Sequence, residues 1–284
     1  MNIETIENWD IRYEDNAPVR TPSGLDIYYE INGAGPPLTI VSNFFLASVA
    51  WRNFTTQLRD RHRLLTYDLR NQGASSEGDG SFENHVADLE AVLDAAGLES
   101  TYLLGTSIST QICRDFAVAH PDRVRGLLLC GPTIHPSGSR RRKFLVKAWL
   151  DDLDRGGLGS LFDNFFPLVF SDRIIETGGT PVYLGLRERF LAVNSTAQLV
   201  TNMRGAAEAV DSPEKLRAID IPVLLFTGDS DYLAGPRALH EAKELLRQAS
   251  IEIIENCGHS PYVEATAQFE AIVERFVGEC ERSR

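Results

Sequence analysis

Short apolar segments alternate with stretches of helical periodicity along most of the chain, and this alternation most restricts its fold. The apolar segments show no polar alternation, as expected for strands buried on both faces, and span residues 38–42, 62–67, 101–104, 124–129, 222–227 and 251–254. Between them, apolar residues recur at three- and four-residue spacing, as in 86–96 and 269–276. Strands alternating with helices form βαβ units. The sequence therefore predicts an α/β fold with a mostly parallel central sheet and helices on both faces.

The N-terminal region lacks this alternation. Residues 1–17 are polar and weakly patterned, so we expect a partly ordered extension there. Residues 20–32 (RTPSGLDIYYEIN) predict two strands that turn at Ser23 and Gly24, which is a hairpin signal.

The alternation also breaks between Pro132 and about Pro213, where the chain is helical in character and contains no convincing strand. Aromatic side chains gather in this stretch: Phe144, Trp149, Phe162, Phe165, Phe166, Phe170, Tyr183 and Phe190. The strand series resumes at Ile221, so we expect a helical cap (lid) at 132–213 inserted into a core formed by 1–131 and 214–284. A separate domain is the weaker alternative, because the chain returns to the same sheet.

Charge and cysteine content exclude several classes of protein. The chain has 40 acidic and 28 basic residues among 284, a net charge of −12 that repels nucleic-acid phosphates and anionic lipid. No apolar run approaches the roughly 20 residues of a membrane span, and the start MNIETIENWD does not resemble a signal peptide. The four cysteines lie far apart without metal-binding spacing. We expect a reduced, cytoplasmic protein with no nucleic-acid or membrane partner, no metal and no cofactor.

One predicted strand leads into a motif with chemical meaning. The strand at 101–104 runs into Gly105-Thr106-Ser107-Ile108-Ser109 and then into a helix, the context of a nucleophile elbow. Such a turn strains its middle residue, so the residues two positions away must be small, as Gly105 and Ser109 are. The helix behind Ser107 directs its N–H groups toward a developing negative charge. The alternative is a serine in an ordinary loop.

Two further residues complete a possible catalytic set. A serine hydroxyl needs a base to take its proton, and the base needs an acid to orient it. Asp231 follows the strand at 222–227, and His259 lies in the loop after the last strand. Functional loops of open α/β sheets gather at the carboxyl ends of the strands. Ser107, Asp231 and His259 all follow such ends in the order Ser, Asp, His, which predicts a catalytic triad.

Asp229 competes with Asp231 as the acid. We favour Asp231, since it stands two residues further out and should point past the sheet edge toward His259. Asp229 is expected to hydrogen-bond its own turn.

These motifs together resemble the α/β-hydrolase superfamily, from about Arg20 to the C-terminus. The segment LTIVSNFFLASVAW resembles the family's oxyanion loop, whose usual HGxP stands where this chain has SNFF (42–45). Its Ser-Asn opening resembles the branch of 3-oxoadipate enol-lactonase. LLTYDLRNQGASS is similar to the family's YDxRGxGxS loop, with Asn71 in place of a glycine. The resemblance implies that the amides of Phe44 and Ile108 form an oxyanion hole.

The chain departs from the family pattern at three places. Ser42 and Asn43 replace a histidine and a glycine, and Ser109 replaces the second glycine of the elbow. Phe45 replaces a proline and would bring a bulky ring near the nucleophile, which predicts a narrowed pocket or a reshaped oxyanion loop and an unusual substrate. The residues expected to line the substrate pocket are Asn43, Phe45, Trp51, Phe165, Phe166 and Tyr183.

Other charged or reactive groups have mainly structural interpretations. The run 140–143 (RRRK) is most simply a solvated helix face, with contact to phosphopantetheine or an acidic carrier as the alternative. Asp68 and Arg70 predict a charge-assisted hydrogen bond that holds their loop beside the sheet. Cys257 lies near His259, but nothing suggests an activated thiolate, so we expect a small filler. The cap aromatics either line an acyl pocket or pack the cap onto the sheet.

The residues predict serine-dependent hydrolysis of a carboxylic ester, lactone or thioester through an acyl-enzyme. The substrate would be a small acyl compound, free or bound to a carrier protein or coenzyme A. The same triad supports acyl transfer, cyclisation or carbon–carbon bond formation on a polyketide-like or fatty acyl intermediate if the cap excludes water. A non-catalytic ligand-binding protein of the same fold is the alternative from another class, and an intact Ser-Asp-His set argues against it.

Overall fold

A seven-stranded sheet forms the centre of the computed structural model, which describes residues 1–134 and 140–283. Its strands are β3 (Tyr29–Asn32), β4 (Pro37–Val41), β5 (Arg63–Tyr67), β6 (Thr101–Thr106), β7 (Val124–Cys130), β8 (Val223–Gly228) and β9 (Ala249–Ile254). Their spatial order is β3-β5-β4-β6-β7-β8-β9, and all neighbours are parallel except β3 and β5. The predicted α/β fold with a mostly parallel sheet is confirmed.

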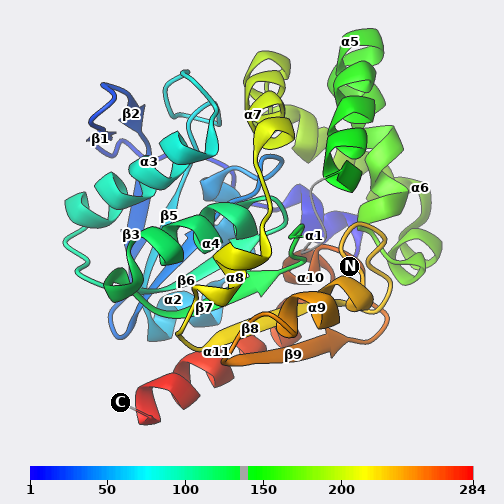
Figure 1. Cartoon of the computed structure of the whole chain (residues 1–284). Coiled ribbons are helices and arrows are strands. Elements are labelled where there is room, and N and C mark those ends of the chain that lie inside the picture. Colours follow the sequence, from blue (N-terminus) through cyan, green and yellow to red (C-terminus); the bar gives the residue numbers. More distant parts are fainter. Residues whose placement is uncertain (135–139, 284) are drawn as a thin grey trace.

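Helices cover both faces of the sheet (Figure 1). Consecutive residues of β6 show this: Leu103 packs in a cluster with α3 (Phe82–Ala95) and α4 (Ser109–Ala119), whereas Leu104 packs in a cluster with α2 (Thr56–Arg61) and α11 (Thr266–Arg282). Further short elements are η1 (Ser48–Asn53), η2 (Pro121–Arg123), α8 (Pro213–Arg217), α9 (Pro236–Lys243) and α10 (Pro261–Glu264). Burial on both faces explains why the parallel strands have no polar alternation.

The register of the parallel strands brings distant loops to one edge. Thr106 at the end of β6 is paired with Cys130 of β7, and Gly228 at the end of β8 is paired with Ile254 of β9. The loops that follow β6, β8 and β9 therefore leave the sheet on the same side.

Long helices lie between β7 and β8, and Figure 1 shows them standing at one end of the sheet. They are α5 (Arg140–Val169), α6 (Asp172–Val193) and α7 (Thr196–Glu208). The first two are bent at Gly157 and Gly179, which have φ values of 66° and 54°. Within the predicted cap 132–213, residues 135–139 lie outside the described residues, as does residue 284 of the second core part. No helix of the described ranges is long and apolar enough to cross a membrane.

The N-terminal segment is more ordered than expected, because it forms a short helix, α1 (Ile3–Glu7), that packs on α6. Ile6 is fully buried, and a Cβ atom on Gly185 of α6 would lie 2.5 Å from Ile3 Cδ1. Arg189 of α6 donates hydrogen bonds to the carbonyl oxygens of Ile6 and Glu7. The expectation of a partly ordered extension was wrong, since the surface that orders this segment comes from a distant part of the chain.

The predicted hairpin also differs in detail. β1 (Val19–Arg20) and β2 (Asp26–Ile27) pair with each other and turn at Gly24, whose φ is 80°. The second predicted strand is then interrupted at Tyr28, whose amide donates to Ser75 Oγ, and it continues as β3 in the large sheet. A side chain of a distant loop thus divides one predicted strand into two.

Candidate active site

Ser107 lies on a strained turn between β6 and α4. Its φ is 53°, in the left-handed region, which costs about 1–3 kcal/mol for a residue other than glycine. Its amide donates to the Cys130 carbonyl at 2.8 Å, which fixes the turn against β7. A Cβ atom on Gly105 would lie 2.6 Å from Cys113 Sγ, so the small residue predicted there is required. The turn holds the Ser107 hydroxyl at the carboxyl edge of the sheet.

The structure brings Ser107, His259 and Asp231 together into one hydrogen-bonded set, called here the Ser-His-Asp array. His259 Nε2 lies 2.8 Å from Ser107 Oγ, and His259 Nδ1 lies 2.8 Å from Asp231 Oδ2. A carboxylate only accepts hydrogen bonds, so Nδ1 carries the imidazole proton and Nε2 is free to accept from the Ser107 hydroxyl. The serine is thereby paired with a base in the protonation state that can take its proton.

Asp231 is fixed by several donors in addition to His259. Thr227 Oγ1 donates to its Oδ2, and the amides of Leu233 and Ala234 donate to its Oδ1, both at 2.8 Å. Burial opposes its ionisation, but His259 and these donors together hold the pKa of Asp231 below its ordinary value. A charged carboxylate therefore orients the imidazole.

The competing carboxylate, Asp229, is bonded to other groups than the imidazole. Asp229 Oδ1 accepts hydrogen bonds from Ser230 Oγ and from the Cys257 amide. These bonds tie the turn after β8 to the loop after β9, as expected for Asp229.

The loop that carries His259 is tied to α5 and α6. The His259 amide donates to the Val169 carbonyl at 2.7 Å. Glu264 accepts from Ser171 Oγ at 2.5 Å and from the Gly258 amide at 3.0 Å. Burial raises the pKa of Glu264, while these donors oppose the rise. The position of the imidazole thus depends on contacts from the segment between β7 and β8.

Two backbone amides next to Ser107 are open. Among the described residues, the amides of Phe44 and Ile108 have no hydrogen-bond partner. The amide of Phe45 is occupied, because it donates to Asn43 Oδ1 at 2.9 Å. Asn43 is held in turn by donating to Tyr262 Oη at 3.0 Å. The Asn43 side chain therefore shapes the loop and leaves the Phe44 amide available, as the family resemblance implies.

Two cavities meet at Ser107. The larger cavity encloses about 790 Å³ including its mouth, and the smaller encloses about 600 Å³. Ser107, Phe45, Trp149 and Leu233 line both of them. Aromatic rings dominate the wall of the larger cavity: Phe45, Trp149, Phe162, Phe165, Phe170 and Phe190. A hydroxyl paired with a base thus faces an apolar space on either side.

Three of the residues predicted for the pocket line these cavities, namely Asn43, Phe45 and Phe165. Phe45 and Phe165 stack with centroids 4.9 Å apart and an interplanar angle of 2°, so the ring of Phe45 is fixed against α5.

The other three predicted pocket residues do not line either cavity, and these predictions are corrected. Trp51 is fully buried, donates from Nε1 to Ser42 Oγ, and packs in a core cluster behind the loop of residues 42–45. Phe166 packs behind the cavity wall, against Phe162, and Tyr183 donates to Asp163. Aromatic type alone did not distinguish lining rings from supporting rings.

Sequence reasoning missed two lining residues, Trp9 and Ile11, which come from the N-terminal segment. It also missed Leu233 and Tyr262, which lie close to Asp231 and His259 along the chain. Proximity to the predicted triad was a usable signal for the second pair. No motif pointed to the first pair.

The basic residues 140–143 of the predicted cap differ in their exposure to solvent. Arg140 and Lys143 are exposed, as expected for a solvated face. Arg142 is buried and donates to Asp211 Oδ2 at 2.7 Å, so a solvated face is wrong for this residue. Arg141 donates to the Tyr232 carbonyl and lines the smaller cavity.

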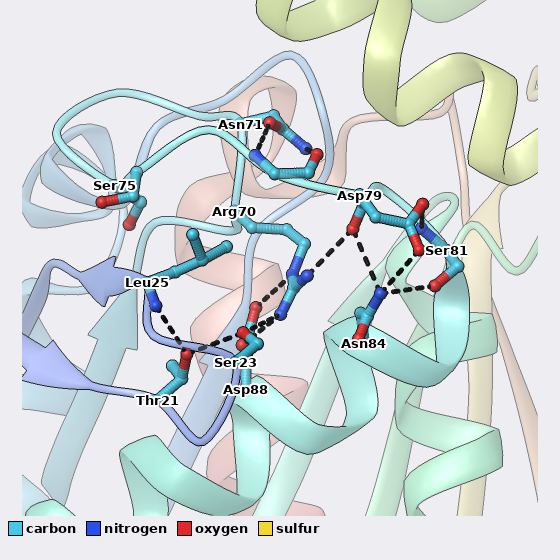
Figure 2. A network of polar contacts seen from close by, with 12 residues as sticks. Thr21, Ser23, Leu25, Arg70, Asn71, Ser75, Asp79, Ser81, Asn84 and Asp88 are labelled. Atoms are coloured by element: carbon cyan, nitrogen blue, oxygen red, sulfur yellow. Dashed lines mark hydrogen bonds and ion pairs between the residues drawn. The ribbon is translucent and has the colours of Figure 1, made fainter.

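Asp68 and Arg70 hold their loop by separate contacts. Figure 2 shows Arg70 between the loop and α3, where its Nε and Nη2 donate to Asp88 at 2.6 Å each. Asp68 accepts from the amides of Ser48 and Ala74. Asn71 in the same loop has a φ of 57°, in the left-handed region where the family has glycine. Asp68 and Arg70 therefore both hold the loop, as predicted, but each does so through its own partners.

Cys257 lies two residues before His259. Burial raises the pKa of Cys257 to about 12, so its thiol is protonated at neutral pH. Over residues 1–134 and 140–283, no group of three or more His, Cys, Asp or Glu side chains is arranged to hold a metal ion.

Comparison with known proteins shows which family the chain belongs to. The chain matches the model of the alpha/beta hydrolase family over residues 31–272. It is 25% identical to the pimeloyl-[acyl-carrier protein] methyl ester esterase of Nitrosospira multiformis over 270 residues, 89% of this chain and 98% of the relative.

Two solved structures share the fold. A thermophilic esterase from Thermogutta terrifontis is similar with a TM-score of 0.84 at 23% identity, covering 94% of this chain and 99% of that one. The enol-lactonase of Burkholderia xenovorans LB400 has a TM-score of 0.77 at 20% identity, covering 92% and 99%. The predicted superfamily resemblance is confirmed, and an enol-lactonase is among the structures of the same fold. The chain belongs to the alpha/beta hydrolase family, and at that level it is a hydrolase.

Proposed function

We propose that the protein hydrolyses a carboxylic ester, lactone or thioester through an acyl-enzyme formed on Ser107. The observation that carries this proposal is the Ser-His-Asp array, with both links at 2.8 Å, opening onto a largely apolar cavity. A serine paired with an oriented imidazole is the arrangement that nucleophilic acyl transfer requires.

In the first step, Ser107 Oγ attacks the substrate carbonyl carbon while His259 Nε2 takes the hydroxyl proton. Asp231 stabilises the imidazolium that forms, because its carboxylate is ionised and accepts from Nδ1. The carbonyl π electrons move to oxygen and give a tetrahedral oxyanion. When the carbonyl re-forms, the alcohol or thiol leaves with the proton from Nε2, and the acyl group stays on Ser107.

The open amides of Phe44 and Ile108 are suited to receive the oxyanion. Neither has a partner among the described residues, and Ile108 directly precedes α4, whose N-terminus favours negative charge. A donor of this kind contributes about 2.7–4 kcal/mol to transition-state stabilisation in a studied protease.

In the second step, water attacks the acyl carbonyl and gives a proton to His259 Nε2. The tetrahedral intermediate collapses, Ser107 takes back a proton, and the carboxylic acid is released. The array returns to its initial state, so no cofactor is consumed in the cycle.

We also propose that residues 132–213 act as the cap of this site, over a core formed by 1–131 and 214–284. The helices α5 and α6 supply four of the aromatic side chains that line the larger cavity, Trp149, Phe162, Phe165 and Phe190. An apolar acyl group gains about 25 cal/mol for each Å² of surface that it buries there. This favours an acyl chain or ring over a polar acid.

A carrier-bound acyl substrate is a second candidate, favoured by Arg141. This side chain lines the smaller cavity beside the exposed Arg140 and Lys143, where an acidic carrier or phosphopantetheine would find positive charge. A related esterase is named for a carrier-bound methyl ester. Exchange of Arg141 for Glu should then lower hydrolysis of a carrier-bound acyl ester more than that of its free methyl ester, and equal losses would exclude carrier recognition by this residue.

Covalent labelling tests the proposal. A fluorophosphonate should phosphonylate the wild-type protein, and Ser107→Ala should abolish the label because it removes the hydroxyl that is paired with His259. Cys257→Ala is the matched control and should label normally, since its thiol is protonated. Labelling that persists in Ser107→Ala would refute the assignment.

A further inference from the structure

The N-terminal segment, residues 1–17 and called here the N-terminal strap, joins the predicted cap to the core. At the cap, α1 packs on α6, and Arg189 donates to the carbonyls of Ile6 and Glu7 at 3.1 and 2.7 Å. At the core, the Asp10 amide donates to Asn53 Oδ1, and Asn53 Nδ2 donates back to the Asp10 carbonyl. The segment between these two anchors is therefore held in place.

A second set of bonds ties the strap further along. Arg52 donates to the Arg12 carbonyl at 2.7 Å, and Tyr13 Oη donates to Asp68 Oδ2 at 2.8 Å. Burial raises the pKa of Tyr13 well above its ordinary value, so this hydroxyl remains a donor through the neutral range. The strap is thus a fixed part of the folded chain.

Between its anchors, the strap presents two apolar side chains to the larger cavity. Trp9 and Ile11 line the same cavity as Ser107 and His259. The indole of Trp9 is supported from behind by Phe54, with ring centroids 5.0 Å apart and an interplanar angle of 87°. A supported ring of this size forms a wall that a substrate must fit against.

Arg189 lines the larger cavity and also fastens the strap. Its Nε and Nη2 already donate to strap carbonyls. The guanidinium therefore fastens the strap to α6.

We propose that the N-terminal strap determines which acyl groups the enzyme accepts, with Trp9 as the main specificity-determining residue. This inference rests on the proposed ester hydrolysis. In it, Trp9 limits the length of the apolar acyl chain that the cavity accepts. The strap precedes the part of the chain that matches the family, residues 31–272, so it adds a wall to the shared fold from outside it.

The test compares p-nitrophenyl esters from acetate to dodecanoate on wild type, Trp9→Ala and Trp9→Phe. We expect Trp9→Ala to raise the ratio of kcat/KM for dodecanoate to that for acetate by about tenfold or more, mainly through KM, since pocket contacts discriminate on this scale. Trp9→Phe keeps a supported ring and should raise the ratio less.

Asn8→Ala is the matched control within the strap. Its side chain is exposed and donates to the Glu4 carbonyl within α1, so the ratio should stay at the wild-type value. An Arg189→Met variant, which loses the donors that fasten the strap, should shift the ratio in the same direction as Trp9→Ala. This second variant keeps the test decisive if Trp9→Ala folds poorly.

Binding without turnover separates this inference from the proposed function. Calorimetry in a Ser107→Ala background measures the affinity for dodecanoate relative to that for hexanoate. We expect Trp9→Ala to raise this ratio of affinities by about tenfold. Wild-type protein inert toward every ester would defeat the proposed function, and this binding preference would still support the strap. An unchanged ratio in both Trp9→Ala and Arg189→Met, or an unchanged binding preference, would overturn the role of the strap.

Discussion

The Ser-His-Asp array and the wall of the larger cavity are built in different ways, although they share one space. The array comes from loops that directly follow β6, β8 and β9, and the strand register fixes where those loops lie. The wall comes from the loop of residues 42–46, bent helices α5 and α6, and the N-terminal strap. Backbone geometry therefore determines the chemistry, whereas the packing of distant segments determines the shape.

This difference predicts different kinds of mutational effect. A change in the array should reduce turnover of all substrates equally, because every substrate passes through the same proton transfers. A change in the wall should alter the order of preferred substrates. Changes in the scaffold that supports both should alter stability.

The largest effect is expected for Asp231→Asn, which keeps the shape but removes the charge that orients His259. We expect kcat to fall by about 10⁴-fold for esters of every acyl length. Asp229→Asn is the control and should stay within a few-fold, since Asp229 accepts from Ser230 Oγ in its own turn and from the Cys257 amide. Steady-state kinetics over the ester series measures both, and a loss that varied with acyl length would break the proposed division.

The next largest effect is a loss of stability, expected when the buried ion pair of Arg70 and Asp88 is broken (Figure 2). Asp88→Ala leaves a buried guanidinium without its partner and should lower the free energy of unfolding by about 3–5 kcal/mol. The exposed pair of Arg237 and Glu241 is the control, where Glu241→Ala should cost about 0.5 kcal/mol or less. Urea denaturation distinguishes the two, and similar losses would contradict the burial argument.

A smaller and pH-dependent effect is expected at His85, behind Phe44. Its ring is fully buried, and burial lowers its pKa from 6.5 to about 3. The unfolded histidine therefore binds a proton below pH 6.5 that the folded one does not bind, so stability falls as the pH drops from 6.5 toward 3. At pH 4 this removes about 3 kcal/mol of the stability present at pH 7.

The matched variant His85→Phe should remove that part of the acid destabilisation, because phenylalanine fits the aromatic surroundings and does not titrate. Urea denaturation of both proteins at pH 7 and pH 4 gives the difference. An equal loss of stability in the two proteins would show that His85 is not its source.

The smallest effect is expected in the wall itself. Phe45→Leu removes the ring that stacks on Phe165 beside Ser107 and should raise the preference for branched over straight acyl esters by about tenfold. Phe166→Leu is the control, since this ring lies behind the wall, and it should leave the preference unchanged. A shift of equal size in both variants would mean that cap packing in general, rather than lining residues, sets selectivity.

The same difference explains what could be predicted from the sequence. Ser107, Asp231 and His259 could be found because each follows a strand of recognisable composition at the end where loops converge. Trp51 was misplaced because nothing in its sequence context shows that its indole bonds Ser42 inside the core. Trp9 and Ile11 were missed because their place depends on α6 and η1, which lie far away in the sequence. Contacts between distant segments leave no local pattern.

Contacts between the predicted cap and the core could likewise not be predicted from the sequence. Asn71 Nδ2 donates to Asn202 Oδ1 of α7, and Asn202 donates back to the Arg70 carbonyl. The motif showed only that Asn71 stands where the family has glycine. These hydrogen bonds can be predicted only if the position of α7 relative to the sheet is known.

The most direct test of the central claim is to locate the acyl group during turnover. After rapid acid quenching of a reaction with a p-nitrophenyl ester, peptide mass spectrometry should find the acyl mass on the peptide of Ser107, specifically on that hydroxyl. Ser107→Ala should carry no acyl group and should lose turnover. An acyl group on a different side chain, or wild-type turnover by Ser107→Ala, would contradict the account.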